Sequence, residues 1–167
     1  MSPALDHPNI QAVLAALRAG GAAASGARMR VLPDAVTTAR AAADALGVDV
    51  AQIANSLVFD AAGEPLLVLA SGAHRVDTGK LAAQLGVLSI KRADPAFVRA
   101  ATGQPIGGVA PVGHPTRLRT VVDTALGRYD EVWAAGGVPH AVFPTTFPEL
   151  VAVTGGEPAD VAAVDHR

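Results

Sequence analysis

Two neighbouring β-forming segments constrain the fold of this chain more than any other feature of the sequence. Ser56–Phe59 and Pro65–Ala70 are short apolar runs, and the Asp60–Glu64 segment between them has the composition of a hairpin loop. Helical and strand-like segments alternate irregularly on either side of this hairpin. The pattern therefore favours a mixed sheet flanked by helices over a doubly wound parallel sheet.

Capping residues mark the boundaries of most predicted helices. A Thr or Asp before an apolar-periodic segment and a glycine after it are typical of a helix with both ends capped. Helices are predicted at residues 9–19, 39–46, 78–85 and 95–102 and from Thr145 or Thr146 to Gly155, with a brief turn after Asp49. Further strands are predicted at residues 29–32, 87–91, 120–123, 131–135 and 141–143. Residues 20–28 are interpreted as a mobile connector and the acidic tail from Glu157 as frayed.

The length of 167 residues fits a single domain. Half of the residues are apolar but only six are Phe, Trp or Tyr, so the core must consist mainly of Ala, Val and Leu side chains. We predict one α/β domain of the α+β type over residues 1–167, with a mixed, mostly antiparallel sheet or open barrel flanked by helices. Its core spans residues 28–156, and its N-terminal helix lies within residues 7–20.

Composition also excludes several classes of function. The chain has no Cys, which excludes a disulfide framework, a thiol nucleophile and a Cys-based metal site, and fits a reducing compartment. Neither an export signal nor a run of about 20 apolar residues is visible. The net charge of -2 leaves no basic excess for broad binding to phosphate backbones. We expect a soluble, cytoplasmic protein with neither a membrane nor DNA as a partner.

The segment Gly103–Pro115 is the most unusual loop of the chain, with four Gly and three Pro in thirteen residues. Glycine permits close approach and left-handed backbone, so the loop could present several N–H groups that hold an oxyanion. It could equally be a crossover between a helix and a strand, and the residues alone leave both interpretations open. The loop is neither a Walker loop nor a dinucleotide fingerprint, so no nucleotide cofactor is implied.

His114 in this loop and His140 in a turn between two predicted strands could each exchange a proton near neutral pH. Each could also be an ordinary loop residue. The other three histidines are interpreted as surface or capping residues: His7, His74 and His166. No pair of histidines has the spacing of a metal motif, so no metal site is predicted.

Two further polar residues receive structural interpretations. Asp77 precedes a predicted helix, so it is interpreted as that helix's N-cap, with Arg75 as a potential partner, rather than as an acid catalyst. Ser56 lacks the Gly-x-Ser-x-Gly elbow of an activated nucleophile and stands at the start of a strand. Its expected role is hydrogen bonding.

Several segments, in order, resemble the YbaK/EbsC family, the free-standing relatives of the editing domain of bacterial prolyl-tRNA synthetase. The matching segments cover nearly the whole chain beyond the first helix: Thr38–Gly47, Gln52–Phe59, Arg75–Asp77 with Lys80-Leu81, Thr102-Gly103, Gly107–His114, Val122-Asp123, Asp130–Trp133 with Gly136-Gly137, and Leu150–Gly155. Each piece alone would be weak, but the loop combined with the strand pattern is fairly specific.

The resemblance implies a single mixed α/β domain that hydrolyses, in trans, the ester joining a small, wrong amino acid to a transfer RNA, with proline tRNA as the expected acceptor. Its partners would be the acceptor end of the aminoacyl-tRNA and prolyl-tRNA synthetase, and it would need no cofactor. Water would attack the ester carbonyl, and N–H groups around Gly107 and Gly108 would stabilise the oxyanion. The family's proton acceptor is often supplied by the substrate.

One departure from the family pattern stands in the central strand, where Asn55 replaces the usual lysine. Asn offers neutral hydrogen bonds in place of a point charge, which would change affinity or specificity. Ala135 and Val142 make the expected pocket more apolar, and His140 is expected to replace a missing polar group. The resemblance thus implies Gly107, Gly108 and His140 as catalytic residues. It implies four substrate-binding residues: Asn55, Ser56, Pro111 and His114.

Two other functions stay open at this point. The chain could be a binding module that kept the fold and lost catalysis, recognising an aminoacyl-adenosine-like ligand or a synthetase, which Asn55 would favour. It could also hydrolyse another small acyl ester without RNA. The pocket interpretation requires that Asn55, the Gly107–Pro111 loop and His140 converge on one cavity.

Overall fold

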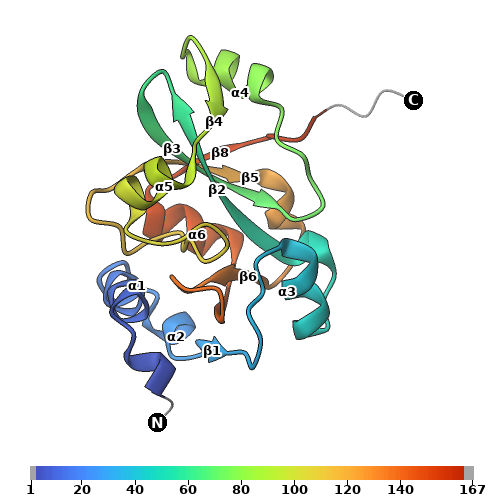
Figure 1. Cartoon of the computed structure of the whole chain (residues 1–167). Coiled ribbons are helices and arrows are strands. Elements are labelled where there is room, and N and C mark those ends of the chain that lie inside the picture. The colour runs from blue at the N-terminus through green and yellow to red at the C-terminus, as the bar shows by residue number, and fades with distance from the viewer. Residues whose placement is uncertain (1–2, 164–167) are drawn as a thin grey trace.

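The computed structural model describes residues 3–163. Its helices and strands follow one another along the chain as labelled in Figure 1. The helical elements are η1 (Pro3–Asp6), α1 (Pro8–Ala19), α2 (Ala23–Gly26), α3 (Ala39–Leu46), η2 (Val50–Gln52), α4 (Thr78–Leu85), α5 (Pro95–Thr102), η3 (Thr124–Arg128) and α6 (Phe147–Thr154). The strands are β1 (Arg30–Val31), β2 (Ile53–Ala61), β3 (Glu64–Ser71), β4 (Ile90–Arg92), β5 (Arg119–Asp123), β6 (Val132–Ala135), β7 (Ala141–Thr145) and β8 (Glu157–Ala159).

Side-chain caps fix where the main helices begin, as the sequence predicts. Each N-cap oxygen accepts a hydrogen bond from a backbone N–H three residues later, at Thr38, Asp77, Asp94 and Thr146. A glycine in the left-handed region ends each of these four helices: Gly47, Gly86, Gly103 and Gly155. Each such N-cap contributes about 1 kcal/mol to stability, which explains why local sequence sets these boundaries. The interpretation of Asp77 as a cap is confirmed.

The described strands form one eight-stranded mixed sheet in the order β1-β7-β6-β2-β3-β5-β8, with β4 also paired to β2. The predicted hairpin is β2 with β3, in the antiparallel register Phe59↔Leu66. Parallel pairs join β2 to β6, β3 to β5 and β5 to β8, whereas the other pairs are antiparallel. The predicted mixed, mostly antiparallel sheet flanked by helices is confirmed.

Three local predictions are wrong. The segment at residues 20–28 is not a loose connector, because it contains α2 and buries Ala22. The tail after Glu157 is not frayed over its described part, because β8 pairs with β5 and Val161 is fully buried. The strand predicted at residues 87–91 begins only at Ile90, since Val87 N–H still donates to Ala82 C=O at the end of α4.

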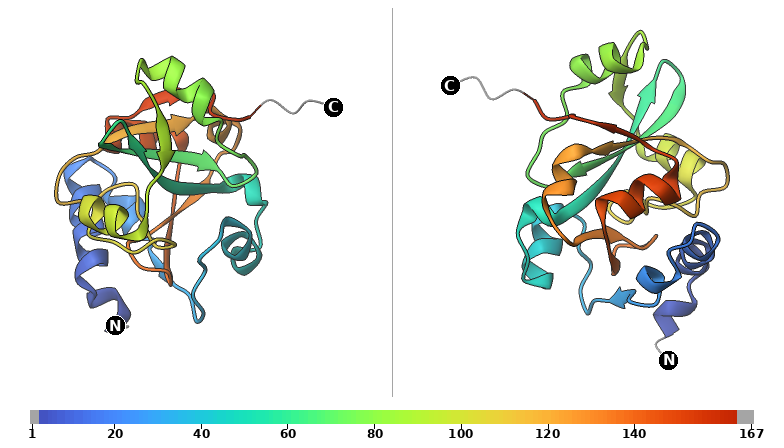
Figure 2. Two further views of the ribbon diagram at one scale, coloured as in Figure 1. Left: turned by 45° about the horizontal axis from the view of Figure 1, so that its top comes forward. Right: turned by 180° about the vertical axis from the view of Figure 1, so that it is seen from behind.

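The helices cover the sheet in separate groups. One apolar cluster joins α1 and α6 to the face of the sheet that carries Leu67 and Leu69. A second packs α4 on the opposite face through Leu81, and a third packs α3 against Trp133. Figure 2 shows α4 at one end of the molecule and the N-terminal helices at the other. Within residues 3–163, no helix is both long enough and apolar enough to cross a membrane.

A split in the sheet lies beside β2. On the edge of β2 away from β3, β6 pairs with Ile53 and Ala54, and β4 pairs only from Phe59 to Ala61. The four residues 55–58 therefore have no strand neighbour on that edge among the described residues. The C=O of Ile53 accepts from Gly72 N–H and so points to the β3 side of β2. The backbone groups of successive strand residues point to opposite edges. The N–H and C=O groups of Ser56 and Val58 therefore point into the split.

Candidate functional site

A cavity of about 270 Å³ opens at this split, and we call it the main cavity. Its walls come from the chain before and at the start of α3, from β2, from the glycine-rich loop, and from β6 and β7. The residues that line it are Val36, Thr37, Thr38, Ala39, Ala42, Ile53, Ala54, Asn55, Ser56, Leu57, Ile106, Gly107, Val109, Trp133, Ala134, Ala135, Pro139, Ala141 and Val142. None of them has an ionisable side chain, so the lining is apolar with a few neutral hydrogen-bonding groups.

Asn55 and Ser56 reach the main cavity from opposite faces of β2, because neighbouring side chains on a strand alternate. The buried hydroxyl of Ser56 has no hydrogen-bond partner among the described residues. An unsatisfied buried hydroxyl costs about 1–3 kcal/mol, and such groups are rare in proteins. The Ser56 hydroxyl is thus a buried donor and acceptor without a partner, on a residue that lines the cavity.

The glycine-rich loop contributes Gly107 to the main cavity. Gly107 has φ +90°, and a Cβ there would lie 3.1 Å from the Cβ of Thr37. Both the backbone conformation and the close approach of Thr37 therefore require glycine at this position. Gly108 does not line the cavity, since it packs against Val138 and Pro139, where an added Cβ would meet backbone at 2.6 Å.

Some backbone N–H groups of this loop donate hydrogen bonds within the loop, and others have no acceptor among the described residues. The N–H of Gly108 donates to Pro105 C=O at 3.0 Å, and the N–H of Ala110 donates to Gln104 Oε1 at 2.7 Å. The N–H groups of Gly107 and Val109 have no hydrogen-bond acceptor among the described residues. Gly107 and Val109 thus line the main cavity with free N–H groups, as Ile106 does, whereas the amide of Gly108 is already used within the loop.

Pro111 and His114 lie away from the main cavity, in a separate hollow between the glycine-rich loop, α1 and α6. Nε2–H of His114 donates to Ala110 C=O at 2.8 Å and so closes the end of the loop. Burial lowers the pKa of His114 below its ordinary value of 6.5, and the hydrogen bond to Ala110 only partly opposes this shift. His114 holds the loop in place in its neutral form.

His140 also lies outside the main cavity. Its side chain is exposed and lines a shallow hollow with Asn9 and Arg99, while its neighbours Pro139 and Ala141 line the main cavity. The backbone C=O of His140 accepts a hydrogen bond from Leu32 N–H at 2.8 Å. Of the predicted site residues, the structure brings together Asn55, Ser56 and Gly107. It places Gly108, Pro111, His114 and His140 elsewhere. The convergence that the pocket interpretation requires is therefore met by Asn55 and part of the loop and not by His140.

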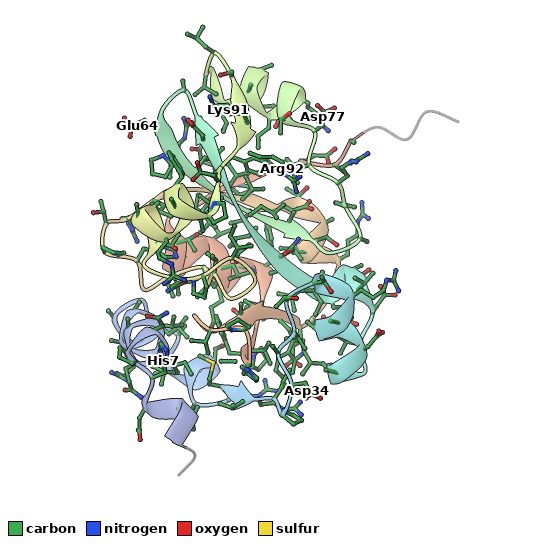
Figure 3. The ribbon with its side chains drawn as sticks, in the orientation of Figure 1. His7, Asp34, Glu64, Asp77, Lys91 and Arg92 are labelled. Atoms are coloured by element: carbon green, nitrogen blue, oxygen red, sulfur yellow. The ribbon has the colours of Figure 1, made fainter. Side chains whose placement is uncertain are left out.

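A second pocket of about 450 Å³ adjoins the main cavity on the other side of the glycine-rich loop. The two share Ser56, Leu57, Ile106, Gly107 and Val109 as a common wall. We call this second space the basic pocket, because its ionisable lining side chains are His74, Arg75 and Arg92. Figure 3 shows Arg92 next to Lys91 on β4, at the end of the molecule that carries α4.

His74 is fixed by a buried carboxylate. Its Nδ1 lies 2.7 Å from Oδ2 of Asp123, whose side chain is fully buried and also accepts from the N–H groups of Ser71 and Ala125. The charge of Asp123 is thus satisfied by three donors, and Nδ1 of His74 must carry a proton. Nε2 of His74 has no partner among the described residues. His74 is therefore neither a surface nor a capping residue as predicted, whereas His7 does cap α1; His166 lies outside the described residues.

Sequence reasoning missed this pair because it depends on parallel strand pairing. Asp123 ends β5, and His74 follows the end of β3 by three residues. The two strands are parallel neighbours, so their carboxyl ends meet at the same edge of the sheet. The signal available in the sequence is a His shortly after one predicted strand together with an Asp at the end of another. Within residues 3–163, no cluster of His, Asp or Glu side chains could hold a metal ion.

Comparisons with known proteins match this chain to a family and to solved structures. Residues 33–153 match the model of the aminoacyl-tRNA editing domain, and these residues contain every wall of the main cavity and of the basic pocket. The solved structure of a candidate trans-editing enzyme for prolyl tRNA synthetase superposes with a TM-score of 0.86 at 41% sequence identity, covering 98% of this chain and 99% of that one.

Sequence relatives extend the same likeness. The uncharacterized protein YwhH of Bacillus subtilis is 32% identical over 114 residues, which are 68% of this chain and 72% of YwhH. The proline–tRNA ligase of Nitratidesulfovibrio vulgaris is 37% identical over 91 residues, 54% of this chain. The match spans only 16% of that ligase. With a family match over most of its length and a full-length structural likeness, the chain belongs to the aminoacyl-tRNA editing domain family.

Proposed function

We propose that this chain is a trans-editing aminoacyl-tRNA deacylase, which hydrolyses the ester that joins a small amino acid to a mischarged tRNA. Proline tRNA is the expected acceptor, because the relatives include proline–tRNA ligases and a candidate trans-editing enzyme for prolyl tRNA synthetase. The acceptor end of the tRNA is then the main partner, with prolyl-tRNA synthetase as a second one. The cytoplasm is the expected compartment.

The observation that carries this proposal is the character of the main cavity. Its volume of about 270 Å³ lies just below the range of roughly 300–1,000 Å³ that is typical of small-molecule sites. The walls at Ala42, Ala135 and Ala141 are small and apolar. Such a cavity suits an apolar side chain, and it disfavours a charged one because the lining has no ionisable partner for it.

The free polar groups of the cavity fit ester hydrolysis. Water attacks the ester carbonyl carbon, the bond to the ribose oxygen breaks, and the ribose leaves with a proton. The N–H groups of Gly107 and Val109 and the Ser56 hydroxyl are donors available to the developing oxyanion. Since no ionisable side chain lines the cavity, proton transfer falls to water or to the substrate itself.

Asn55 is assigned to substrate positioning. Asn55 lines the cavity and its amide has no hydrogen-bond partner among the described residues, so a donor and an acceptor are available to a ligand. A neutral amide there can bind the ester or the terminal ribose without adding a charge to an apolar cavity.

The experiment is the release of amino acid from tRNAs charged with alanine, cysteine, serine or proline, measured with the purified chain. We expect rapid hydrolysis of one mischarged species and sparing of correctly charged proline tRNA. Turnover of simple esters but not of tRNA would instead indicate a general esterase. No hydrolysis above the uncatalysed rate would refute the deacylase assignment.

Asn55→Lys refines the same experiment. If Asn55 sets specificity, the variant loses the activity of the wild type towards its preferred species. If instead the wild type is inactive and Asn55→Lys creates hydrolysis, the natural chain is a binder that lost catalysis. Thermal unfolding of both proteins controls for damage to the fold.

A further inference from the structure

Gln104 is a polar side chain in the interior of the chain to which the deacylation step assigns no role. It stands at the start of the glycine-rich loop and is only 1% exposed. Its Oε1 accepts a hydrogen bond from Ala110 N–H at 2.7 Å, so this one side chain bridges the stretch of the loop between them. That stretch contains Ile106, Gly107 and Val109, which line the main cavity with free N–H groups.

The backbone of Gln104 is anchored to α5. The hydroxyl of Thr102, a buried residue in the last turn of that helix, accepts from Gln104 N–H at 3.0 Å. The same hydroxyl lies 2.8 Å from Val98 C=O, to which it can donate. The carboxamide of Gln104 therefore reaches the loop from a fixed point at the end of a regular helix.

Side chains hold both backbone groups of Ala110. Gln104 binds its N–H, and Nε2–H of His114 donates to its C=O at 2.8 Å. Ala110 directly follows Val109, so a shift of Ala110 would also move the backbone that lines the main cavity. A misplacement of about 1 Å caused by a residue far from the reacting atoms can lower a rate about 10²-fold. Gln104 can thus affect the rate without touching the substrate.

Stability alone does not explain an amide at this place. Nε2 of Gln104 has no hydrogen-bond partner among the described residues, so both of its hydrogens are unpaired in the interior. An unbranched methionine could fill the same space and would leave only the N–H of Ala110 unpaired. Each buried donor without a partner is destabilising. Because the glutamine leaves more donors unpaired than it satisfies, its bond to Ala110 points to a role in holding the loop.

We propose that Gln104 is a positioning residue for deacylation, which holds the glycine-rich loop through Ala110 and so keeps the free N–H groups of Gly107 and Val109 in place at the main cavity. This inference rests on the proposed function. Gln104 lines neither the main cavity nor the basic pocket, so it acts through the loop and not on the substrate.

Gln104→Met removes the acceptor for Ala110 N–H and keeps an apolar side chain in its place. In single-turnover hydrolysis of the mischarged tRNA at pH 6, we expect the rate at saturating enzyme to fall roughly tenfold or more. The enzyme concentration that gives half of this rate should not change. The midpoint of denaturant unfolding should stay close to that of the wild type, because fewer buried donors are unpaired.

Gln104→Glu is the rescue variant. Its carboxyl group again offers an acceptor to Ala110 N–H, and burial favours the neutral form of this group at pH 6. We therefore expect it to regain most of the wild-type rate. Rescue by a side chain that lacks Nε2 would show that the bond to Ala110 is the part of Gln104 that matters.

Gln52→Met is the matched control. The amide of Gln52 accepts from Asp49 N–H at 3.1 Å and donates to Glu131 C=O at 3.2 Å, so both of its polar atoms are paired. Gln52 does not line the main cavity. We expect this variant to unfold at a lower denaturant concentration and to keep the wild-type rate, which is the reverse of the result for Gln104→Met.

Hydrogen exchange at the amide of Ala110, measured by NMR, tests the contact without catalysis. Exchange should be at least roughly tenfold faster in Gln104→Met than in the wild type, since the N–H loses its acceptor. Unchanged exchange would overturn the proposal, because the loop would then be held by other contacts.

The possible failures can be told apart. A wild-type rate in Gln104→Met, or a loss that Gln104→Glu does not restore, would overturn the positioning role while the deacylase function stands. A loss of rate that comes with a lower unfolding midpoint would make Gln104 a structural residue only. If the wild type hydrolyses no mischarged tRNA, the proposed function falls and takes the positioning role with it.

Discussion

The main cavity and the basic pocket lie on two sides of the same wall and differ in almost every physical respect. The main cavity is lined by apolar and neutral groups, and the N–H groups of Ile106, Gly107 and Val109 and the Ser56 hydroxyl have no partner among the described residues. The basic pocket holds two arginines and a histidine fixed to a buried carboxylate. The same strand, β2, serves both.

This difference suits the main cavity to the reaction and the basic pocket to binding of the substrate. In a small cavity without charges, hydrogen bonds to a developing oxyanion are strong because little competes with them. In an exposed pocket, arginines can bind a phosphate that stays partly in water. A site divided in this way predicts that changes in the main cavity alter kcat and that changes in the basic pocket alter KM.

The largest expected effect comes from Gly107→Ala. The new methyl group would lie 3.1 Å from the Cβ of Thr37 and would move the free N–H groups of the loop, so we expect kcat for deacylation to fall about 10²- to 10³-fold. Single-turnover hydrolysis of the mischarged tRNA measures it.

Gly63→Ala is its matched control. Gly63 has φ +94°, close to that of Gly107, but it lies in the β2–β3 turn with open space around its Cβ position. Both variants should lose stability from the strained backbone, by about 1–2 kcal/mol, while only Gly107→Ala loses activity. Equal activity of the two variants would contradict the assignment of the loop.

Ser56→Ala is expected to have opposite effects on stability and activity. Removing a buried hydroxyl without a partner should raise the free energy of unfolding by up to about 1 kcal/mol. Removing a donor to the oxyanion should lower kcat about tenfold. Denaturant unfolding and the tRNA assay measure the two quantities.

Ser71→Ala provides the comparison for this variant. The Ser71 hydroxyl donates to Ala51 C=O at 2.9 Å, so its removal should lower the free energy of unfolding by about 1 kcal/mol. The opposite signs at two serines would show that the Ser56 hydroxyl is kept for function. A loss of stability in Ser56→Ala would mean that this hydroxyl has a structural role.

A smaller effect is expected on the salt dependence of kcat/KM, which tests whether the arginines of the basic pocket contact a phosphate. One phosphate contact contributes a slope of roughly -0.7 in the logarithm of affinity against the logarithm of salt concentration for single strands. The variant with Arg75→Gln and Arg92→Gln should therefore lose about that much of the wild-type slope in kcat/KM for mischarged tRNA. An unchanged slope would show that these arginines do not neutralise a phosphate.

Local sequence was sufficient to predict much of this fold and only part of the site. Thr38, Asp77 and Gly47 fix helix ends through contacts within a few residues, so their roles follow from composition and spacing. The pairing of β5 with β8 joins segments that are distant in the sequence, so local composition could not predict it and the prediction of a frayed tail is wrong.

The same distinction holds within the site. Asn55, Ser56 and Gly107 could be selected because strand position, an unusual loop and the family resemblance all pointed to them. The pairing of His74 with Asp123 joins residues 49 positions apart through two parallel strands, which no local pattern indicates. His140 stands in a predicted turn between two strands and is expected to replace a missing polar group, but its side chain is exposed and lies outside the main cavity.

His114 and His74 differ in their partners. His114 is buried against the C=O of Ala110, whereas His74 is paired with the carboxylate of Asp123. Burial lowers the pKa of His114 below 6.5, so below that pH the unfolded chain binds a proton that the folded chain still excludes. The contribution of His114 to stability is therefore complete above pH 6.5 and is lost as the pH falls towards its folded pKa.

His114→Gln tests this directly, because a glutamine amide can donate to Ala110 C=O without titrating in this range. Denaturant unfolding at pH 8 and at pH 5.5 should show the wild type losing more stability on acidification than the variant, since all other titrating groups are common to both. A pH-independent difference between the two proteins would mean that His114 is protonated as easily in the folded chain as in the unfolded one, and that the glycine-rich loop is not closed by a neutral histidine.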